Sequence, residues 1–372
     1  MAPLKLGMVG GGQGAFIGGV HRMAARLDGC FDLVAGAFSS DPERAHVSAA
    51  ELGIDPARSY ADFKEMARAE AARSDGIDAV AIVTPNHLHG PIAEAFLAHD
   101  ISVICDKPMT ATLEQAESLR VAAKASRGHF FLTHNYTGYP MIRQARQIVT
   151  DGALGQIRIV EANYLQDWLS EAPTEDNKQA KWRLDAAQSG GGAIGDIGTH
   201  AYNLVCFVTG QRATSLSATL SSSVVGRAVD DDARVSLQFV GEARGHIWAS
   251  QVAIGNENNL TLAVYGSKGT LRWSQENPNV LWFSKLGKAT QMITRGSRAA
   301  GSAAAAVTRI PAGHPEGYLE AFATLYREAA EEIKLQGKSD NTLGVEEGFD
   351  GVRFVDACQR SSRDSGIWID LQ

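Results

Sequence analysis

The chain has 372 residues, of which 44% are hydrophobic and 21% charged, and its formal net charge at pH 7 is −7. A chain of this length exceeds the size at which one core usually stops growing, so we expect two domains. The acidic balance argues against nucleic acid as a partner, and no apolar run approaches the roughly 20 residues of a membrane span. Four widely spaced cysteines without a C-x-x-C pair indicate thiols in a reducing cytoplasm, with no disulfide framework and no metal site.

A strand over Leu4–Val9 is the first expected element, and a glycine-rich loop and an amphipathic helix follow it directly. The loop fits the pattern G-x-G-x-x-G/A, in which backbone N–H groups and a helix N-terminus hold a pyrophosphate. The loop alone could also be a plain tight turn, but its place between strand and helix favours a dinucleotide site. The cofactor residues expected in this stretch are Gly10, Gly12, Gln13, Gly14, Ala15, Phe16 and Ile17.

The choice between NAD and NADP depends on the end of the second expected strand, Phe31–Phe38. An acidic residue close to this strand end normally holds the 2′-hydroxyl and repels a 2′-phosphate. Here Ser39 and Ser40 offer hydroxyl groups and Arg44 a cation. None of these residues excludes a 2′-phosphate, so the choice between NAD and NADP stays open at this point. The Asp41-Pro42 pair is also expected to cap the next helix.

Polar clusters follow two further expected strands, Asp78–Val83 and Ile101–Cys105, and another strand runs from about His129 to Asn135. The carboxyl ends of parallel strands form the edge at which doubly wound sheets bind ligands. Lys107 could place an ammonium group on a substrate oxygen there, and a solvated lysine at a strand end is the alternative. Cofactor contacts at this edge are expected from Thr84, Pro85, Asn86, His89, Asp106, Lys107, Pro108 and Asn135.

The second half of the chain changes pattern, because alternating runs follow one another without helices between them. Expected strands are Ile157–Trp168, Leu216–Val225, Arg234–Val240, Gly245–Val252, Leu260–Tyr265 and Thr270–Trp273. The fold class is therefore α/β, with a Rossmann domain over 1–135 and an α+β domain with a large, mainly antiparallel open sheet over 136–372. A free sheet face suggests a homo-oligomer, a dimer or tetramer. The segment Lys285–Arg309, rich in Gly, Ser, Ala and Thr, is expected to be irregular.

The stretch Gly190–His200 combines five glycines, one carboxylate and one imidazole. If a helix begins at about Gly195, Asp196 and His200 stand four residues apart and share one helical face. An acid and a base placed in this way can move a proton on one substrate atom. The alternative is a glycine-rich turn before a buried helix whose histidine has only a structural role.

Four motifs occur in an order that resembles the Gfo/Idh/MocA family of oxidoreductases: the glycine loop, Thr84-Pro85-Asn86-x-x-His89, Asp106-Lys107-Pro108 and Gly191-Gly192-x-x-x-Asp196-Ile197-Gly198-x-His200. The resemblance covers nearly the whole chain. It implies a catalytic set of Lys107, Asp196 and His200, which oxidises a secondary alcohol while a hydride passes to nicotinamide. The family's Glu-Lys-Pro is Asp106-Lys107-Pro108 here, and its frequent acid after the histidine motif is Asn203. The sequence is further similar to the branch that holds scyllo-inositol/L-glucose, levoglucosan and glycoside 3-dehydrogenases. This resemblance implies NAD as cofactor, with NADP not excluded.

A mixture of hydrogen-bonding groups and flat aromatic faces is expected around the site, and it suits a sugar or cyclic polyol as substrate. The expected substrate contacts are Lys107, Tyr136, Gln166, Asp167, Trp168, Arg183, Asp196, His200 and His314. Two alternatives remain open from the sequence. One is an NADPH-dependent sugar ketone reductase, similar to 1,5-anhydrofructose reductase. The other is a regulator that binds a sugar or dinucleotide without reaction.

Overall fold

The computed structural model describes residues 2–172, 182, 185–335, 337 and 339–371. The described chain divides into two units. The first holds residues 1–135 and 322–350, and the second holds 136–321 and 351–372. The first segment therefore ends where the Rossmann domain is expected to end, whereas residues 322–350 group with this first unit and not with the second.

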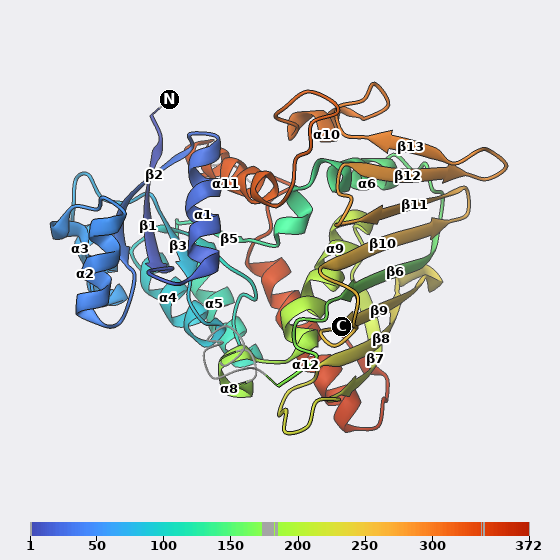
Figure 1. Ribbon diagram of the computed structural model, residues 1–372, viewed down its shortest axis with the longest axis horizontal. Helices are drawn as coiled ribbons and strands as arrows, with labels where there is room; N and C mark the ends of the chain where they lie inside the picture. Colours follow the sequence, from blue (N-terminus) through green and yellow to red (C-terminus); the bar gives the residue numbers. More distant parts are fainter. Residues whose placement is uncertain (1, 173–181, 183–184, 336, 338, 372) are drawn as a thin grey trace. The chain divides into compact units, whose positions relative to one another are not determined.

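The first unit contains a parallel sheet of five strands in the order β2-β1-β3-β4-β5 among its described residues (Figure 1). The chain adds β2 on one side of β1 and then β3, β4 and β5 on the other side. Because crossovers between parallel strands are right-handed, this change of direction places helices on both faces of the sheet. This arrangement confirms the expected Rossmann fold. The strands are β1 (Leu4–Gly10), β2 (Phe31–Ala37), β3 (Ala79–Val83), β4 (Ser102–Cys105) and β5 (Phe130–Leu132).

Helices of the first unit begin where the sequence provides capping residues. The side chains of Asp41, Asp62 and Thr112 each accept a hydrogen bond from a backbone N–H in the first turn. Asp41 and Pro42 thus cap a helix as expected. The helices are α1 (Phe16–Leu27), α2 (Pro42–Glu51), α3 (Phe63–Ala71), α4 (His89–Leu97) and α5 (Leu113–Ala125), and short 3₁₀ turns span Pro56–Arg58 and Asn86–Leu88.

The second unit is built on a sheet of nine strands among the described residues, in the order β13-β12-β11-β10-β6-β9-β8-β7-β14. All neighbours are antiparallel except β6 and β9, which confirms the expected mainly antiparallel sheet. The strands are β6 (Ile157–Leu165), β7 (Ala213–Ser221), β8 (Asp232–Phe239), β9 (Arg244–Ser250), β10 (Asn259–Gly266), β11 (Gly269–Ser274), β12 (Val280–Lys285), β13 (Gln291–Thr294) and β14 (Ile369–Asp370).

One face of this sheet is covered by helices and the other is open. Leu260, Leu262 and Val264 alternate along β10 and are buried, while α6 (Pro140–Thr150) and α9 (Thr199–Thr209) pack against strands of the sheet. Ile159 and Trp282 are exposed large apolar side chains on other strands. Because buried and exposed residues alternate along these strands, the sequence pattern predicted them.

The expectation of an irregular segment over Lys285–Arg309 is wrong in part. Strand β13 pairs with β12 through a hairpin that turns at Gly287, where φ is +73°. A short helix, α10 (Ser302–Ala306), follows. The small residues that suggested irregular structure are compatible with a two-stranded edge and one helical turn. The remaining helices are α8 (Ala186–Ser189), α11 (Tyr318–Leu335) and α12 (Val345–Arg363).

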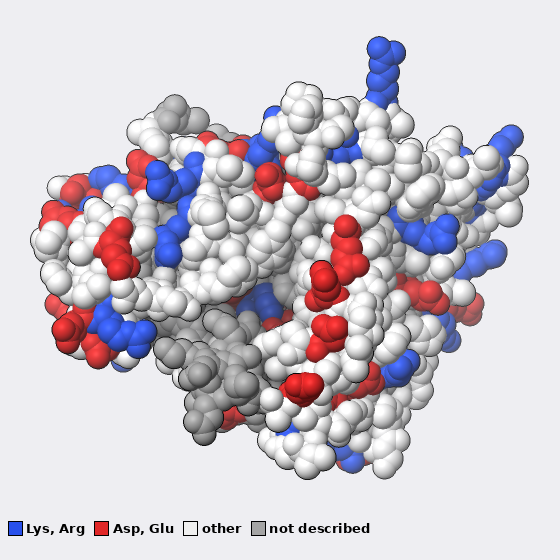
Figure 2. Space-filling model, in the orientation of Figure 1, with Lys and Arg blue, Asp and Glu red and all other residues white. Residues whose placement is uncertain are grey.

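No helix of the described residues is long and apolar enough to cross a membrane. On the face drawn in Figure 2, Lys and Arg side chains are mixed with Asp and Glu side chains. Within the described part of the chain, no group of three or more His, Cys, Asp or Glu side chains could hold a metal ion. The four cysteines are thiols.

Candidate active site

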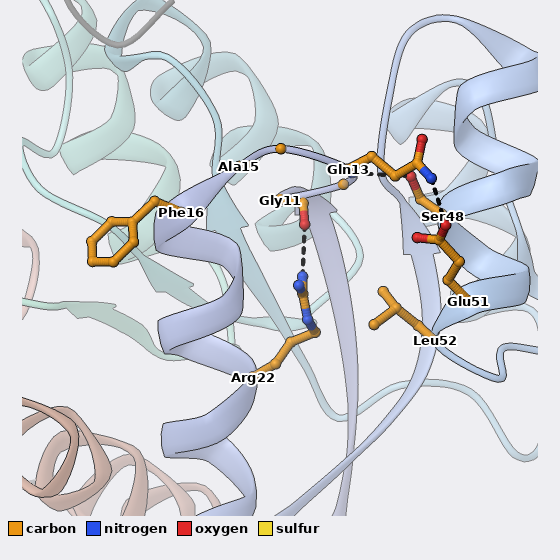
Figure 3. A pocket seen from close by; sticks show the side chains of 10 residues that line it. Gly11, Gln13, Ala15, Phe16, Arg22, Ser48, Glu51 and Leu52 are labelled. Carbon is orange, nitrogen blue, oxygen red and sulfur yellow. Dashed lines mark hydrogen bonds between the residues drawn. The ribbon is translucent and has the colours of Figure 1, made fainter.

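The glycine loop between β1 and α1 forms one side of a cleft of about 640 Å³ (Figure 3). Expected cofactor residues Gly12, Gln13, Gly14, Ala15 and Phe16 line this cleft. The lining also includes five residues that the sequence did not single out, Gly11, Arg22, Ser48, Glu51 and Leu52. Gly10 and Ile17 belong to the same loop and helix but are not part of the lining.

Side chains from α1 and α2 hold the loop in place (Figure 3). The Gln13 backbone N–H donates to Ser48 Oγ at 3.2 Å, and Gln13 Nε2 donates to the Glu51 carboxylate. The Arg22 guanidinium donates to the Gly11 carbonyl oxygen at 2.6 Å. These bonds fix the loop from both sides.

The loop meets the requirements of a pyrophosphate site. Gly10, Gly11 and Gly14 have positive φ, which side-chain-bearing residues rarely adopt. A Cβ at Gly12 would lie 2.8 Å from both the Phe38 carbonyl oxygen and Ser48 Oγ. Ala15 is the N-cap of the 12-residue helix α1 and supplies no side-chain hydrogen bond, so the first N–H groups of α1 suit an anion.

The close approach between loop and helix occurs at Gly18, three residues beyond Ala15. A Cβ on Gly18 would overlap the backbone of Gly11. In the dinucleotide pattern the third glycine allows this approach. The longer loop therefore moves that role from Ala15 to Gly18, which the sequence interpretation missed.

We expect Gly18→Ala to destabilise the first unit by about 1–3 kcal/mol, because the added methyl group forces backbone apart in a packed region. Weaker NAD binding should accompany this loss, since the loop moves with Gly11. Thermal unfolding with and without NAD measures both effects. Gly19→Ala is the matched control: its Cβ would meet only Arg22 Nη2 at 3.9 Å, so equal damage by both variants would contradict the packing role.

The predicted cofactor residues after β2 lie at the surface and are not part of the cleft lining. Ser39 is half-buried, and Ser40 and Arg44 are exposed. Ser39 Oγ accepts a hydrogen bond from the Asp41 N–H at 3.1 Å, and Asp41 Oδ1 accepts from the Arg44 N–H at 3.0 Å. The contact of these three residues with a cofactor stays a prediction.

The carboxyl ends of β3, β4 and β5 meet at one edge of the parallel sheet, as expected. Thr84 Oγ1 and Asn135 Nδ2 are buried atoms without a hydrogen-bond partner among the described residues. A buried polar atom is costly unless a ligand or water pairs with it. Their position on the same edge suits a bound cofactor. Pro85 is half-buried and Asn86 is buried beside Thr84.

His89 is buried between two backbone carbonyl groups, and its contact with a cofactor stays a prediction. Its Nδ1 lies 2.7 Å from the Pro108 carbonyl oxygen and its Nε2 lies 2.8 Å from the Thr84 carbonyl oxygen. Burial lowers the pKa of His89, although both carbonyl contacts oppose this shift. The neutral imidazole has one N–H, which can donate to either carbonyl oxygen, so His89 packs between the end of β3 and the turn after β4.

The Asp106 carboxylate fixes the backbone at Lys107. Its Oδ1 accepts from the Lys107 N–H at 2.9 Å and from Thr133 Oγ1 at 3.3 Å. Buried His21 lies beside it, with Nε2 3.9 Å from Oδ1 and Nδ1 2.9 Å from the Tyr326 hydroxyl. Burial raises the pKa of Asp106, but the neighbouring His21 and Lys107 lower it by more. The turn therefore holds an ionised carboxylate beside the backbone of Lys107, and the Lys107–Pro108 peptide bond is cis.

In the second unit, the expected α-helix from Gly195 begins instead as a π-helical turn, Ile194–Gly198. The Thr199 N–H donates to the Ile194 carbonyl oxygen, and α9 continues from Thr199. Gly198 lies close to the Ile194 side chain, since a Cβ there would lie 2.7 Å from Ile194 Cδ1. Such turns are frequent at functional sites. Asp196 lies in the π-helical turn and His200 in the first turn of α9.

Aromatic rings surround His200, which is 7% exposed. The Tyr136 ring meets the imidazole edge-on with ring centroids 4.9 Å apart, and the Tyr164 centroid lies 6.1 Å away. Asp196 Oδ2 accepts a hydrogen bond from Gln251 Nε2 at 2.9 Å. Burial raises the pKa of both tyrosines, so their hydroxyls stay protonated and able to donate.

A hydrogen-bond network connects the expected substrate residues through Asn258. Asn258 Oδ1 accepts from the Tyr164 hydroxyl at 2.7 Å and from Gln166 Nε2 at 2.8 Å, and its Nδ2 donates to the Tyr136 hydroxyl at 3.4 Å. Tyr136 and Tyr164 also hydrogen-bond each other. Gln166 Oε1 accepts from the half-exposed Trp168 indole at 3.0 Å. This hydrogen-bond network around Asn258 therefore includes Tyr136, Gln166 and Trp168.

Other expected substrate residues lie outside this network. The Asp167 carboxylate accepts from the Gly255 N–H at 3.0 Å and holds a loop. His314 is exposed, and its carbonyl oxygen accepts from Arg295, whose guanidinium also pairs with Glu316 at 3.0 Å. Arg183 lies outside the described residues. Tyr164, Asn258 and Gln251 were missed, because they lie in strand and loop positions whose neighbours in sequence carry no motif.

Comparison with known proteins identifies the family of this chain. Residues 4–136 match the model of the oxidoreductase family with an NAD-binding Rossmann fold, and residues 142–272 match the Gfo/Idh/MocA C-terminal domain. A crystal structure of an oxidoreductase from Sinorhizobium meliloti is 49% identical, covers 100% of both chains and superposes with a TM-score of 0.91. The chain therefore belongs to the Gfo/Idh/MocA family of oxidoreductases, and its first unit is an NAD-binding Rossmann domain.

Two further relatives are named for, or solved with, a polyol or a sugar derivative. An inositol dehydrogenase homologue from Azotobacter vinelandii, solved with NADH and myo-inositol, is 37% identical, with a TM-score of 0.92 over 99% of this chain and 97% of that chain. Levoglucosan dehydrogenase of Pseudarthrobacter phenanthrenivorans is 28% identical over 76% of each chain.

Proposed function

We propose that this oxidoreductase catalyses the NAD-dependent oxidation of a secondary alcohol on a sugar or cyclic polyol to the ketone. The proposal depends above all on the environment of His200 in the second unit. A buried imidazole beside two protonated tyrosine hydroxyls, with Asp196 oriented by Gln251, is suited to a neutral polyhydroxylated substrate. The NAD-binding domain in the same chain provides the reason to assign a redox reaction.

We assign the chemical steps to three side chains. His200 takes the proton of the reacting hydroxyl as general base, and Asp196 orients that hydroxyl. The ammonium group of Lys107 stabilises the negative charge that develops on the oxygen. When bound, NAD accepts the hydride at nicotinamide C4. The glycine loop with Gly12–Phe16, together with Thr84 and Asn135, would hold the cofactor.

We assign the selection of the substrate to the hydrogen-bond network around Asn258. Tyr136, Gln166 and Trp168 combine polar groups with flat aromatic rings, which suit the hydroxyls and apolar face of a sugar ring. Asp167, Arg183 and His314 remain proposed contacts from the family resemblance. The relatives with myo-inositol and levoglucosan support cyclic polyols and anhydrosugars as the first compounds to test.

The direct test mixes the protein with NAD or NADP and a panel of myo-inositol, scyllo-inositol, L-glucose and levoglucosan, and follows the near-ultraviolet absorbance of the reduced nicotinamide. We expect NADH to form with at least one compound. Reaction with NADP alone would assign a role to Ser39, Ser40 and Arg44 in binding the 2′-phosphate. Binding of a polyol without any reduced cofactor would instead favour the sensing regulator.

We further propose a cytoplasmic homo-oligomer, either a dimer or a tetramer, in which the open sheet face of the second unit is covered. Exposed Ile159, Trp282 and Met292 on that face support an interface, since large apolar side chains on one face favour burial. Light scattering of the eluting protein measures the mass. A monomeric mass at micromolar concentration would contradict the proposal.

A further inference from the structure

Asp230 holds the glycine loop that leads into the π-helical turn. Its Oδ1 accepts a hydrogen bond from the Gly192 N–H at 2.9 Å, and its Oδ2 accepts from the Ile194 N–H at 2.7 Å. The backbone carbonyl of Asp230 accepts from the Ala193 N–H at 2.9 Å. One residue, 36 or more positions away in sequence, therefore binds three consecutive amides.

The fit between Asp230 and the loop depends on glycine. A Cβ at Gly192 would overlap the Asp230 carbonyl oxygen, so no other residue allows this approach. The Gly192 carbonyl oxygen in turn accepts from the Asp196 N–H at 2.9 Å. The position of Gly192 thus determines where the turn that carries Asp196 begins.

The neighbouring aspartates hold other parts of the unit. Buried Asp231 binds the N–H groups of Ser223 and Val224 and pairs with Arg227 at 3.1 Å. Asp232 accepts from the Trp248 indole at 2.7 Å. Of the three consecutive carboxylates, Asp230 is the one bonded to the glycine loop, which makes Asp232 a matched control.

We propose that Asp230 is a positioning residue, whose ionised carboxylate fixes the loop Gly190–Ile194 and thereby places Asp196 and His200. The proposal rests on the proposed function of those two residues. Asp230 itself touches neither of them through the bonds described, so its effect on catalysis passes through the backbone of Gly192 and Ile194. Loss of the hydrogen bonds to Asp230 would let the π-helical turn shift. A misplacement of catalytic groups by about 1 Å can lower the rate about 100-fold.

The proposal predicts a pH dependence. Burial raises the pKa of Asp230 to about 6, against the opposing effect of the two backbone N–H groups. The titratable groups that face it are Asp231 and the Cys358 thiol of α12, while the loop itself offers only backbone N–H groups. Below about pH 6 a protonated oxygen would face an N–H donor, so the loop should loosen as the pH falls through this value.

Global stability should respond in the opposite direction. Because the pKa of Asp230 in the folded protein lies above the unfolded value of about 3.9, the folded state binds this proton more tightly. The contribution of Asp230 to the free energy of unfolding is then largest below the unfolded pKa and is lost as the pH rises through about 6.

Amide hydrogen exchange of the full-length protein tests the proposal without any substrate. After correction for intrinsic rates, we expect the peptide that covers Gly190–His200 to exchange about tenfold or more faster at about pH 5 than at about pH 8. Asp230→Asn should exchange rapidly at both pH values, because its amide nitrogen cannot accept an N–H. Asp232→Asn should behave like the wild type.

Equal exchange of this peptide in wild type and Asp230→Asn at both pH values would overturn the proposal, and so would a pH-independent wild type. With an active substrate, kcat of Asp230→Asn should fall about tenfold or more while the KM for NAD is unchanged. If no polyol is oxidised by the wild type, the proposed function fails, yet the exchange measurement still decides the role of Asp230.

Discussion

His200→Ala is expected to lower kcat for polyol oxidation by about 10²–10⁴-fold, the usual value of a positioned general base. The affinity for NAD should be nearly unchanged, because the glycine loop that would hold the pyrophosphate belongs to the other unit of the chain. Steady-state kinetics, together with a fluorescence titration of NAD, measures both quantities.

His246→Ala is the matched control for this experiment. His246 is exposed on β9, so its removal should leave kcat unchanged. Wild-type turnover by His200→Ala would contradict the assignment of the base. The same loss of turnover in both variants would point to a general effect of removing an imidazole.

Lys107→Met is expected to lower kcat by about 10²–10³-fold, since one well-placed donor to a developing oxyanion contributes about that factor. Methionine keeps the length of the side chain and removes its charge. The turn should survive the change, because Asp106 binds the backbone N–H of Lys107 and not its ammonium group. Stopped-flow measurement of the first turnover separates the chemical step from product release.

Lys288→Met, in the exposed hairpin between β12 and β13, is the control for loss of a lysine charge. It should turn over like the wild type. An effect of Lys107→Met on KM alone, with kcat preserved, would show that Lys107 binds the ground state without stabilising the transition state.

Local patterns in the sequence were sufficient to predict most helices and strands of the fold. The strand, glycine loop and helix of the first β/α unit follow one another within 27 residues, so their order alone predicts a dinucleotide site. The strands of the large sheet alternate buried and exposed residues, which marks them individually. Strand β13 was missed because it is a short edge strand in which only Ile293 of four residues is buried, which leaves no clear alternation.

The candidate site was only partly predictable, because its geometry depends on contacts between distant residues. Nothing in Gly190–His200 distinguishes a π-helical turn from an α-helix, and the loop before the turn is bonded to Asp230, 36 or more residues away. Gln251 and Asn258 come from the region after β9 and orient Asp196 and the tyrosines. The role of Gly18 was not predicted, because the longer loop places this glycine three residues beyond the third position of the usual pattern. His89 matched a motif, but its two carbonyl partners became visible only in the folded chain.

The transfer of a hydride from a ring carbon to the cofactor is the central claim, and deuterium follows it directly. Myo-inositol that carries deuterium on every ring carbon is incubated with the protein and NAD, and the reduced cofactor is analysed by mass spectrometry. The account predicts reduced cofactor that carries one deuterium, and none with the His200→Ala variant in the same time. If no reduced cofactor forms with labelled myo-inositol, scyllo-inositol, L-glucose or levoglucosan, or if it forms without deuterium, the proposed oxidation of a ring alcohol is contradicted.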